Sequence, residues 1–302
     1  MNLTIEPGEF VYVIGTTGAG KSTFIKLLYR EEKATSGKVE VVGRDVSKIK
    51  NRKVPYFRRN IGVVFQNFRL LPKKTVFENV AFALEVIDTP RVEIRRRVRA
   101  TLELVGLEDK VNAFPHELSG GMKQRVMIAI ALVGSPSIVI ADEPTTSLDV
   151  TIEAQILDVL KNLQKTLGTS IILITHDLGV IAKLCDRVLV MYGGKIVERG
   201  SVDEIFYDTA HPYTKGLMHS IAKLDTAKGH KLQPIEGTPP DLFAPPKGCP
   251  FAARCEYCME ICKDMPPQTY ELSKEHETCC WLQHEYAPDT DMRRKVTEKG
   301  EV

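Results

Sequence analysis

Short apolar runs alternate with stretches of helical periodicity along the first two thirds of the chain. The runs are uninterrupted, as in strands that are buried on both faces of a sheet. They lie at residues 10–14, 61–66, 137–143 and 170–176. Apolar residues recur at helical spacing after residue 22, through most of 75–134 and along 151–167. Strands that alternate with helices in this way predict an α/β fold with a mostly parallel sheet covered on both faces.

Two weaker patterns predict further strands. Residues 38–42 alternate polar and apolar positions, which is typical of a strand with one exposed face. Residues 187–192 and 195–199 are β-prone and are joined through Gly193-Gly194, so we expect them to form a hairpin.

The composition changes near residue 223, where the periodic pattern ends. A proline-rich stretch follows, then a cysteine-rich segment, and the last residues are mostly charged. We therefore expect a first domain over residues 1–225, with a helical subdomain at about 67–134. An extension rich in proline and cysteine would cover 226–287, and residues 288–302 would form a disordered tail.

Charge and hydropathy exclude several functional classes. The chain has 302 residues, and its 41 Lys and Arg nearly balance its 39 Asp and Glu, which gives no argument for a nucleic-acid partner. No stretch approaches the roughly 18 consecutive apolar residues of a membrane span. The first residues lack the basic-then-apolar layout of a secretory signal, so we expect a cytosolic chain.

A phosphate-binding loop is the strongest motif. Residues 15–22 read GTTGAGKS and fit the pattern G-x-x-x-x-G-K-[ST], between a strand-like run and a helical stretch. The glycines allow backbone N–H groups to close around phosphate oxygens at the N-terminus of the helix. Lys21 would reach the β- and γ-phosphates, and Ser22 would hold Mg²⁺. The predicted nucleotide contacts are Gly15, Thr16, Thr17, Gly18, Ala19, Gly20, Lys21, Ser22 and Thr23.

Polar residues at the ends of three apolar runs are candidates for catalysis. Asp142 would support Mg²⁺, and Glu143 would act as general base on the attacking water. His176 could donate to the γ-phosphate, and the amide of Gln66 could contact both Mg²⁺ and the water. The alternatives are two solvent-facing acids, a structural histidine and an incidental glutamine.

A second anion site is predicted at Leu118-Ser119-Gly120-Gly121, where small residues precede a long helix. One nucleotide needs only one phosphate loop. We therefore expect two chains to pair head to tail, each closing the nucleotide site of the other.

In this order, these motifs resemble the ATP-binding subunit of ABC transporters. The resemblance covers residues 1 to about 205 and includes Ser147-Leu148-Asp149. It implies a P-loop NTPase fold and ATP held between two such subunits, in a homo- or heterodimer. Ser119 and Gly121 would contact the γ-phosphate bound by the partner's Lys21, and Asp149 would couple the two sites. It also implies permease partners and a peripheral location on the cytoplasmic face of the membrane.

Two subfamilies contribute to this resemblance. Residues 122–285 resemble the ATPases of di- and oligopeptide importers, whereas residues 8–121 resemble the cell-division ABC ATPase. We interpret the chain as a hybrid joined near Gly120-Gly121. The upstream aromatic residue that stacks on adenine in the family is missing, so either the chain is short at its N-terminus or adenine is held less well. Peptide import is the leading prediction. The alternatives are a cell-division ATPase that works without transport and a nucleotide-binding scaffold that does not hydrolyse ATP.

The extension contains six of the seven cysteines. Four thiolates can hold a [4Fe–4S] cluster or Zn²⁺, and cysteines in a reducing compartment favour a metal site over disulfides. The importer resemblance matches Cys249, Cys255, Cys262 and Cys279 and implies a [4Fe–4S] cluster. Zinc and unligated thiols remain alternatives, and Cys258 and Cys280 would be extra.

Overall fold

The structure is a computed structural model, which describes residues 2–65, 68–146, 148–175, 185–220, 235–242 and 244–294. The chain forms two compact units. One unit comprises Met1–Leu3, Tyr12–Lys21 and His176–Val302, and the other comprises Thr4–Val11 and Ser22–Thr175. We call the first the loop unit, because it contains most of the phosphate loop, and the second the helical unit. The predicted boundary between residues 225 and 226 falls inside the loop unit.

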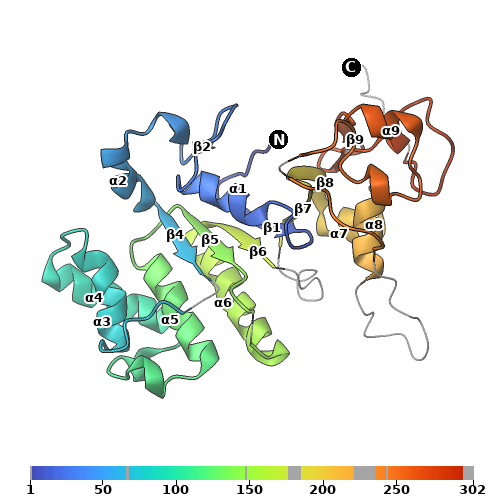
Figure 1. The fold of residues 1–302 in the computed structure, drawn as a ribbon. Coiled ribbons are helices and arrows are strands. Elements are labelled where there is room, and N and C mark those ends of the chain that lie inside the picture. Colours follow the sequence, from blue (N-terminus) through green and yellow to red (C-terminus); the bar gives the residue numbers. More distant parts are fainter. Residues whose placement is uncertain are drawn as a thin grey trace, which may run out of the picture. The chain divides into compact units, whose positions relative to one another are not determined.

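Parallel strands form the centre of the helical unit (Figure 1). Strands β4 (Ile61–Val64), β5 (Ile138–Asp142) and β6 (Ser170–Ile174) pair in parallel in that order. The start of β1 (Phe10–Ile14) lies in the same unit, where the Ile171 N–H donates to the Glu9 carbonyl oxygen at 2.9 Å. The apolar runs therefore form the expected buried parallel strands.

Among the described residues, six α-helices belong to this unit, most of them within the segments predicted to be helical. They are α1 (Lys21–Leu28), α2 (Val54–Arg58), α3 (Val76–Glu85), α4 (Arg91–Leu104), α5 (Gly120–Leu132) and α6 (Val150–Leu167). The first three helices after residue 70 pack together as the predicted helical subdomain (Figure 1). Each of α3, α5 and α6 begins at a side chain that accepts a hydrogen bond from the helix backbone. Such caps satisfy N–H groups that have no partner within the helix, so they fix where it starts.

Antiparallel pairing dominates the loop unit. Strands β7 (Arg187–Tyr192) and β8 (Lys195–Ser201) form the predicted hairpin. The extension adds β10 (Glu277–Thr278) beside β8 and β9 (Tyr270–Glu271) beside β10, both antiparallel. The helices of this unit are α7 (Val202–Tyr207), α8 (Pro212–His219) and α9 (Glu260–Asp264). The prediction of parallel pairing thus holds for the helical unit, whereas a tight turn and a returning extension give the loop unit antiparallel strands.

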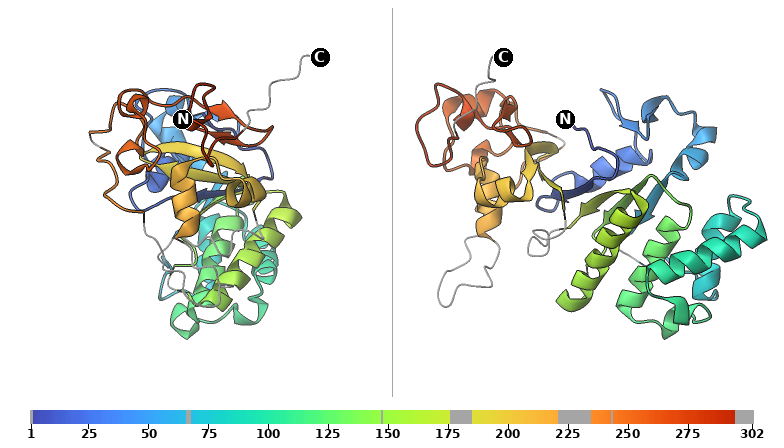
Figure 2. Two further views of the ribbon diagram at one scale, coloured as in Figure 1. Left: turned by 90° about the vertical axis from the view of Figure 1, so that its right-hand side faces the viewer. Right: turned by 180° about the vertical axis from the view of Figure 1, so that it is seen from behind.

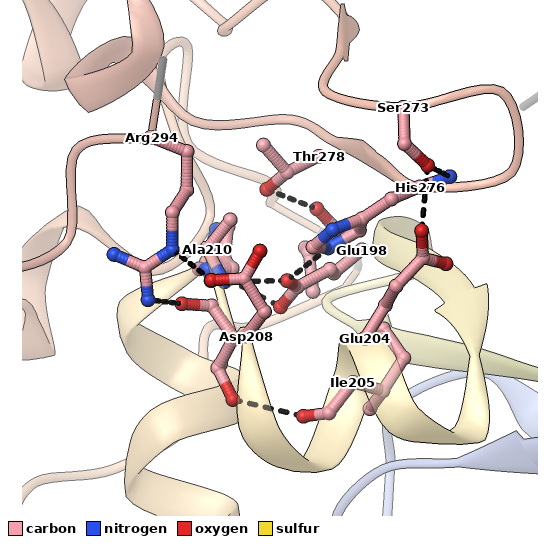
Figure 3. Close-up of polar contacts among 12 residues, drawn as sticks. Glu198, Glu204, Ile205, Asp208, Ala210, Ser273, His276, Thr278 and Arg294 are labelled. Atoms are coloured by element: carbon pink, nitrogen blue, oxygen red, sulfur yellow. Dashed lines mark hydrogen bonds and ion pairs between the residues drawn. The ribbon is translucent and has the colours of Figure 1, made fainter. Parts of the chain in front are cut away.

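The extension, orange to red in Figure 2, lies beside β8 and α7, and polar contacts attach it to both elements (Figure 3). The carboxylate of Glu198 on β8 accepts from the backbone N–H groups of Ala210 at 2.6 Å and His211 at 3.2 Å. It also contacts Nε2 of His276 at 2.9 Å, and both side chains are almost fully buried. Ser273 donates to Glu204 on α7 at 2.6 Å. Glu198 therefore satisfies groups from two other segments of the chain, the α7–α8 connection and the stretch before β10.

Two further expectations need correction. The strand predicted at 38–42 is only β2 (Glu40–Val41), paired with β3 (Arg44–Asp45) in a separate two-stranded sheet. The disordered tail predicted from residue 288 is ordered as far as residue 294. Met292 is buried, and Arg294 donates to the Asp208 carboxylate and to the Thr209 carbonyl oxygen. These contacts hold the segment although its composition is mostly polar.

Candidate nucleotide site

The phosphate loop follows β1 directly and leads into α1. Gly15 and Gly20 have positive φ angles of 151° and 100°. A Cβ on Gly15 would lie 2.2 Å from the Met191 carbonyl oxygen, and one on Gly20 would lie 3.2 Å from Cα of Gly194. Both positions require glycine because of the conformation and because the β7–β8 hairpin lies so close.

Lys21 is held inside its own loop. Its side chain is buried, and Nζ donates to the carbonyl oxygens of Gly15 at 2.6 Å and Thr16 at 3.2 Å. The N–H of Ala19 donates to the Thr16 carbonyl oxygen at 3.0 Å and closes the first turn. The loop therefore positions an ammonium group beside the N-terminus of a helix, which is the arrangement that binds phosphate.

The residues around this lysine fit a phosphate group. Thr17 and Gly18 are exposed, and a Cβ on Gly18 would meet no atom within 4 Å, so one side of the loop is open. Ser22 and Thr23 lie in the first turn of α1 and are also exposed. The Ser22 side chain is therefore accessible, and its role as a magnesium ligand stays a prediction.

Asp142 and Glu143 lie at the carboxyl end of β5 in the helical unit. Asp142 is the last residue of the strand, and Glu143 has a left-handed backbone with φ of 47°. The Glu143 N–H donates to the Ile174 carbonyl oxygen at 2.9 Å, and its carboxylate accepts from Thr146 Oγ1 at 3.2 Å. The strand thus ends between the two acids, and the change of backbone conformation redirects the second side chain.

The helices α5 and α6 begin close together in the same unit. Ser119 caps α5, and Asp149 caps α6 by accepting from the Ile152 N–H at 2.9 Å. A Cβ on Gly121 would lie 2.6 Å from Cγ2 of Ile152. The second anion site predicted at Ser119, Gly120 and Gly121 is therefore a helix N-terminus beside another one, which strengthens the local positive potential.

A buried pair supports this second region. Thr145 Oγ1 donates to the Glu153 carboxylate at 2.6 Å, and both side chains are buried. The pair ties the turn after Glu143 to the first turn of α6. Predicted site residues Gln66 and His176 lie outside the described residues, as does Ser147.

The cysteines of the extension gather around one small cavity. Four of them line it, together with the buried rings of His211 and Phe251. These four are Cys249, Cys255, Cys262 and Cys280. Cys279 instead lies where its backbone N–H donates to the Val197 carbonyl oxygen at 2.7 Å and its sulfur contacts Thr269 Oγ1 at 3.4 Å. The importer resemblance selects Cys279 and leaves Cys280 as extra, whereas the structure places Cys280 and not Cys279 at this cavity.

Burial dominates the electrostatics of these thiols. It raises the pKa of Cys249 to about 11 and of Cys255 to about 12, and it also raises the pKa of Cys280. Nε2 of His211 has no hydrogen-bond partner among the described residues, and burial lowers the pKa of this imidazole to about 3. Four thiols and an unpaired imidazole nitrogen are donors of the kind that bind zinc or an iron–sulfur cluster.

The side chains of the described residues are not arranged as a metal-binding site. Within them, no group of three or more His, Cys, Asp or Glu side chains is arranged to hold a metal ion. The described chain also lacks any helix that is both long and apolar enough to cross a membrane.

Family models match the two parts of the chain separately. A model of the ABC transporter family matches residues 1–146. A model described as the oligopeptide/dipeptide transporter C-terminal region matches residues 197–262.

Similar proteins agree with both models. The oligopeptide transport ATP-binding protein OppD of Bacillus subtilis (strain 168) is 43% identical over 99% of this chain and 87% of its own length. The dipeptide transport ATP-binding protein DppD of the same organism is also 43% identical, over 93% and 87%. The cell division ATP-binding protein FtsE of Streptococcus pneumoniae (serotype 2 strain D39 / NCTC 7466) is 48% identical over 69% of this chain and 90% of its own.

Solved structures share the fold. The cbiO1 protein of Clostridium perfringens, part of the ABC transporter complex cbiONQ, matches with a TM-score of 0.66 and 33% identity over 69% of this chain and 84% of its own. The ATP-binding cassette MJ0796, a dimer in a post-hydrolysis state bound to ADP and Pi, matches with a TM-score of 0.59 and 34% identity over 67% and 88%. The predicted P-loop NTPase fold of the ABC ATPase type is confirmed.

Proposed function

The chain belongs to the family of ABC transporter ATP-binding proteins, and we propose that it binds ATP with Mg²⁺ and hydrolyses it to power the import of di- and oligopeptides. The observation that carries this proposal is the presence in one chain of the phosphate loop and the C-terminal region matched at residues 197–262. The permease subunits of such a transporter would be its membrane partners, and the protein would work peripherally on the cytoplasmic face.

Each candidate residue receives one role. Lys21 and the loop glycines would neutralise and orient the β- and γ-phosphates, while Ser22 and Asp142 would hold Mg²⁺. Glu143 would take a proton from the attacking water, with Gln66 and His176 orienting the water and the γ-phosphate. Magnesium, when bound, stabilises the negative charge that develops during phosphoryl transfer.

Closure of the site would require a second subunit. Ser119 and Gly121 at the start of α5 would meet the γ-phosphate bound by the other subunit, and Asp149 at the start of α6 would link the two sites. The N-termini of α5 and α6 support this role, because the positive ends of two helix dipoles lie close together in one unit.

A second candidate function rests on the similarity to FtsE, which is 48% identical over 69% of this chain. Such a protein would act on a cell-division membrane partner without transport. We also keep the hybrid interpretation as a proposal, although the similarity to OppD extends over 99% of the chain.

Reconstitution tests the leading proposal. We expect the wild-type protein to assemble with a peptide permease in lipid vesicles and to hydrolyse ATP faster when peptide is delivered. A Glu143→Gln variant should bind ATP normally but lose turnover by about a hundredfold or more, since general base catalysis contributes that much. Undiminished hydrolysis in this variant would contradict the assignment of the base. Assembly only with a cell-division membrane protein would favour the second candidate.

The cavity in the extension is proposed as a metal site. The donors support a [4Fe–4S] cluster or Zn²⁺ held by Cys249, Cys255 and Cys262, with Cys280 in place of the predicted Cys279. The extension has few apolar residues for its length, so we propose a structural role for the metal.

A further inference from the structure

Tyr213 on α8 touches the phosphate loop at its first turn. The N–H of Thr16 donates to Oη of Tyr213 at 2.8 Å, and the same hydroxyl lies 3.4 Å from Oγ1 of Thr16. The tyrosine is fully buried, and burial raises its pKa, so the hydroxyl keeps the proton that it donates to Thr16. A residue far along the chain thus satisfies a backbone N–H group of the loop.

The backbone of Thr16 makes the hydrogen bonds that hold the phosphate loop in shape. Its carbonyl oxygen accepts from the N–H of Ala19 at 3.0 Å and from Nζ of Lys21 at 3.2 Å. The N–H of Thr16 is occupied by Tyr213, so this group fixes the loop rather than contacting phosphate. Lys21 is therefore bound to the carbonyl oxygen of Thr16, and Tyr213 is bound to the N–H of the same residue. The position of Lys21 thus depends on the tyrosine.

Aromatic packing fixes the ring of Tyr213. The ring centroid lies 4.5 Å from that of Tyr192 on β7 and 5.4 Å from that of Phe251. The rings of Tyr192 and Phe251 meet edge to face at 5.2 Å. Phe251 lies two residues after Cys249 and lines the same cavity as the thiols. The ring that orients the hydroxyl is thus packed against the cysteine-containing extension.

The turn between β7 and β8 makes a second connection. The N–H of Gly194 donates to the carbonyl oxygen of Ala19 in the phosphate loop at 2.9 Å. On the other side of the turn, a Cβ on Gly193 would lie 2.8 Å from Cβ of Pro250. The extension therefore contacts the elements that support the phosphate loop at two places.

We propose that Tyr213 is a positioning residue of the nucleotide site, and that through it the cysteine-containing extension maintains the phosphate loop in its binding conformation. This inference rests on the proposed ATP-binding function. The hydroxyl holds Thr16, and Thr16 holds the turn that presents Lys21. A loop without this hydrogen bond loses order in the free protein and must recover it when the nucleotide binds.

The test is Tyr213→Phe, which removes the hydroxyl and keeps the ring. We expect the Kd for ADP and the KM for ATP to rise about tenfold, since the part-buried Thr16 N–H loses the Tyr213 hydroxyl as its acceptor. The value of kcat at saturating ATP should stay within about twofold, because the bound nucleotide orders the loop again. Hydrogen exchange at the Thr16 amide should become faster. Tyr207→Phe is the matched control, since that side chain is 84% exposed.

A second variant separates positioning from folding. Phe251→Leu loosens the ring of Tyr213 but leaves its hydroxyl in place, and we expect a smaller rise in the Kd for ADP with the same faster exchange at Thr16. Unchanged Kd and exchange in both variants would overturn the inference. Failure of the wild-type protein to bind ADP or ATP would instead refute the proposed function, so the two failures are distinguishable.

Discussion

At the scale of single residues, the backbone conformation of Glu143 sets the direction of its side chain relative to that of Asp142. Glu143 has a left-handed backbone although it is not glycine, a conformation that costs about 1–2 kcal/mol. The cost is met locally, because its N–H donates to the Ile174 carbonyl oxygen and its carboxylate accepts from Thr146. Strain of this kind is often found at functional sites, and here it separates the directions of two adjacent acids.

Adjacent cysteines give a residue-scale prediction. Cys280→Ser should lower the metal content of anaerobically prepared protein by removing one of four thiolate ligands, whereas Cys279→Ser should leave it unchanged. Iron, sulfide and zinc analysis, with the visible absorption spectrum, would measure this. Metal affinity should also rise with pH, because burial raises the pKa of Cys249 and Cys255 and binding must release their protons. Equal metal loss in both variants would contradict the choice of Cys280.

At the scale of elements, the extension depends on one buried acid on β8. Glu198 accepts hydrogen bonds from Ala210 and His211 and contacts His276, so it joins the α7–α8 connection to the segment before β10 (Figure 3). The neighbouring pair β8–β10 has only two residues of β10 to hold it. We therefore expect the carboxylate network to contribute more than the strand pairing to the attachment of the extension.

Glu198→Gln should loosen this attachment. The amide of glutamine would place an N–H₂ group against backbone donors, so we expect a loss of about 2–4 kcal/mol in the stability of the extension. Hydrogen exchange over residues 268–285 would report it as faster exchange. Glu275→Gln is a suitable control, because that side chain is exposed and lies next to His276. Protection equal to that of wild type in the Glu198 variant would show that the strand pairing suffices.

At the scale of the whole molecule, the residues proposed for the nucleotide site are distributed over two units. The loop unit contains the phosphate loop as far as Lys21, and the helical unit contains Asp142, Glu143 and the start of α5. Each chain has one phosphate loop and one capped N-terminus of α5. Two chains could therefore share a site, with the loop supplied by one chain and the helix N-terminus by the other.

ATP should therefore drive dimerisation. We expect Glu143→Gln protein to be a dimer in saturating MgATP, because bound ATP persists and bridges the two subunits. Lys21→Ala is the control and should remain monomeric, since it loses the charge that holds the phosphates. Light scattering coupled to size-exclusion chromatography would measure both. A Glu143→Gln protein that stays monomeric with ATP bound would contradict the shared site.

The sequence by itself determined the elements whose signals are local. The phosphate loop requires glycines and a lysine at fixed spacing, buried parallel strands require apolar runs, and the β7–β8 turn requires Gly193-Gly194. The helical spacing of apolar residues predicted α3 to α6 for the same reason. The pattern of residues 10–22 thus sufficed to locate the nucleotide loop and to predict the family fold.

Only the tertiary structure decided what depends on pairing between distant segments. Adjacent residues in an extended chain point to opposite sides, so the contact of Cys279 with β8 turns Cys280 toward the cavity. The burial of Glu198 and the hydrogen bond from Thr16 to Tyr213 likewise join positions far apart in the sequence. No local pattern encodes such contacts, because they arise only when the extension packs against the hairpin.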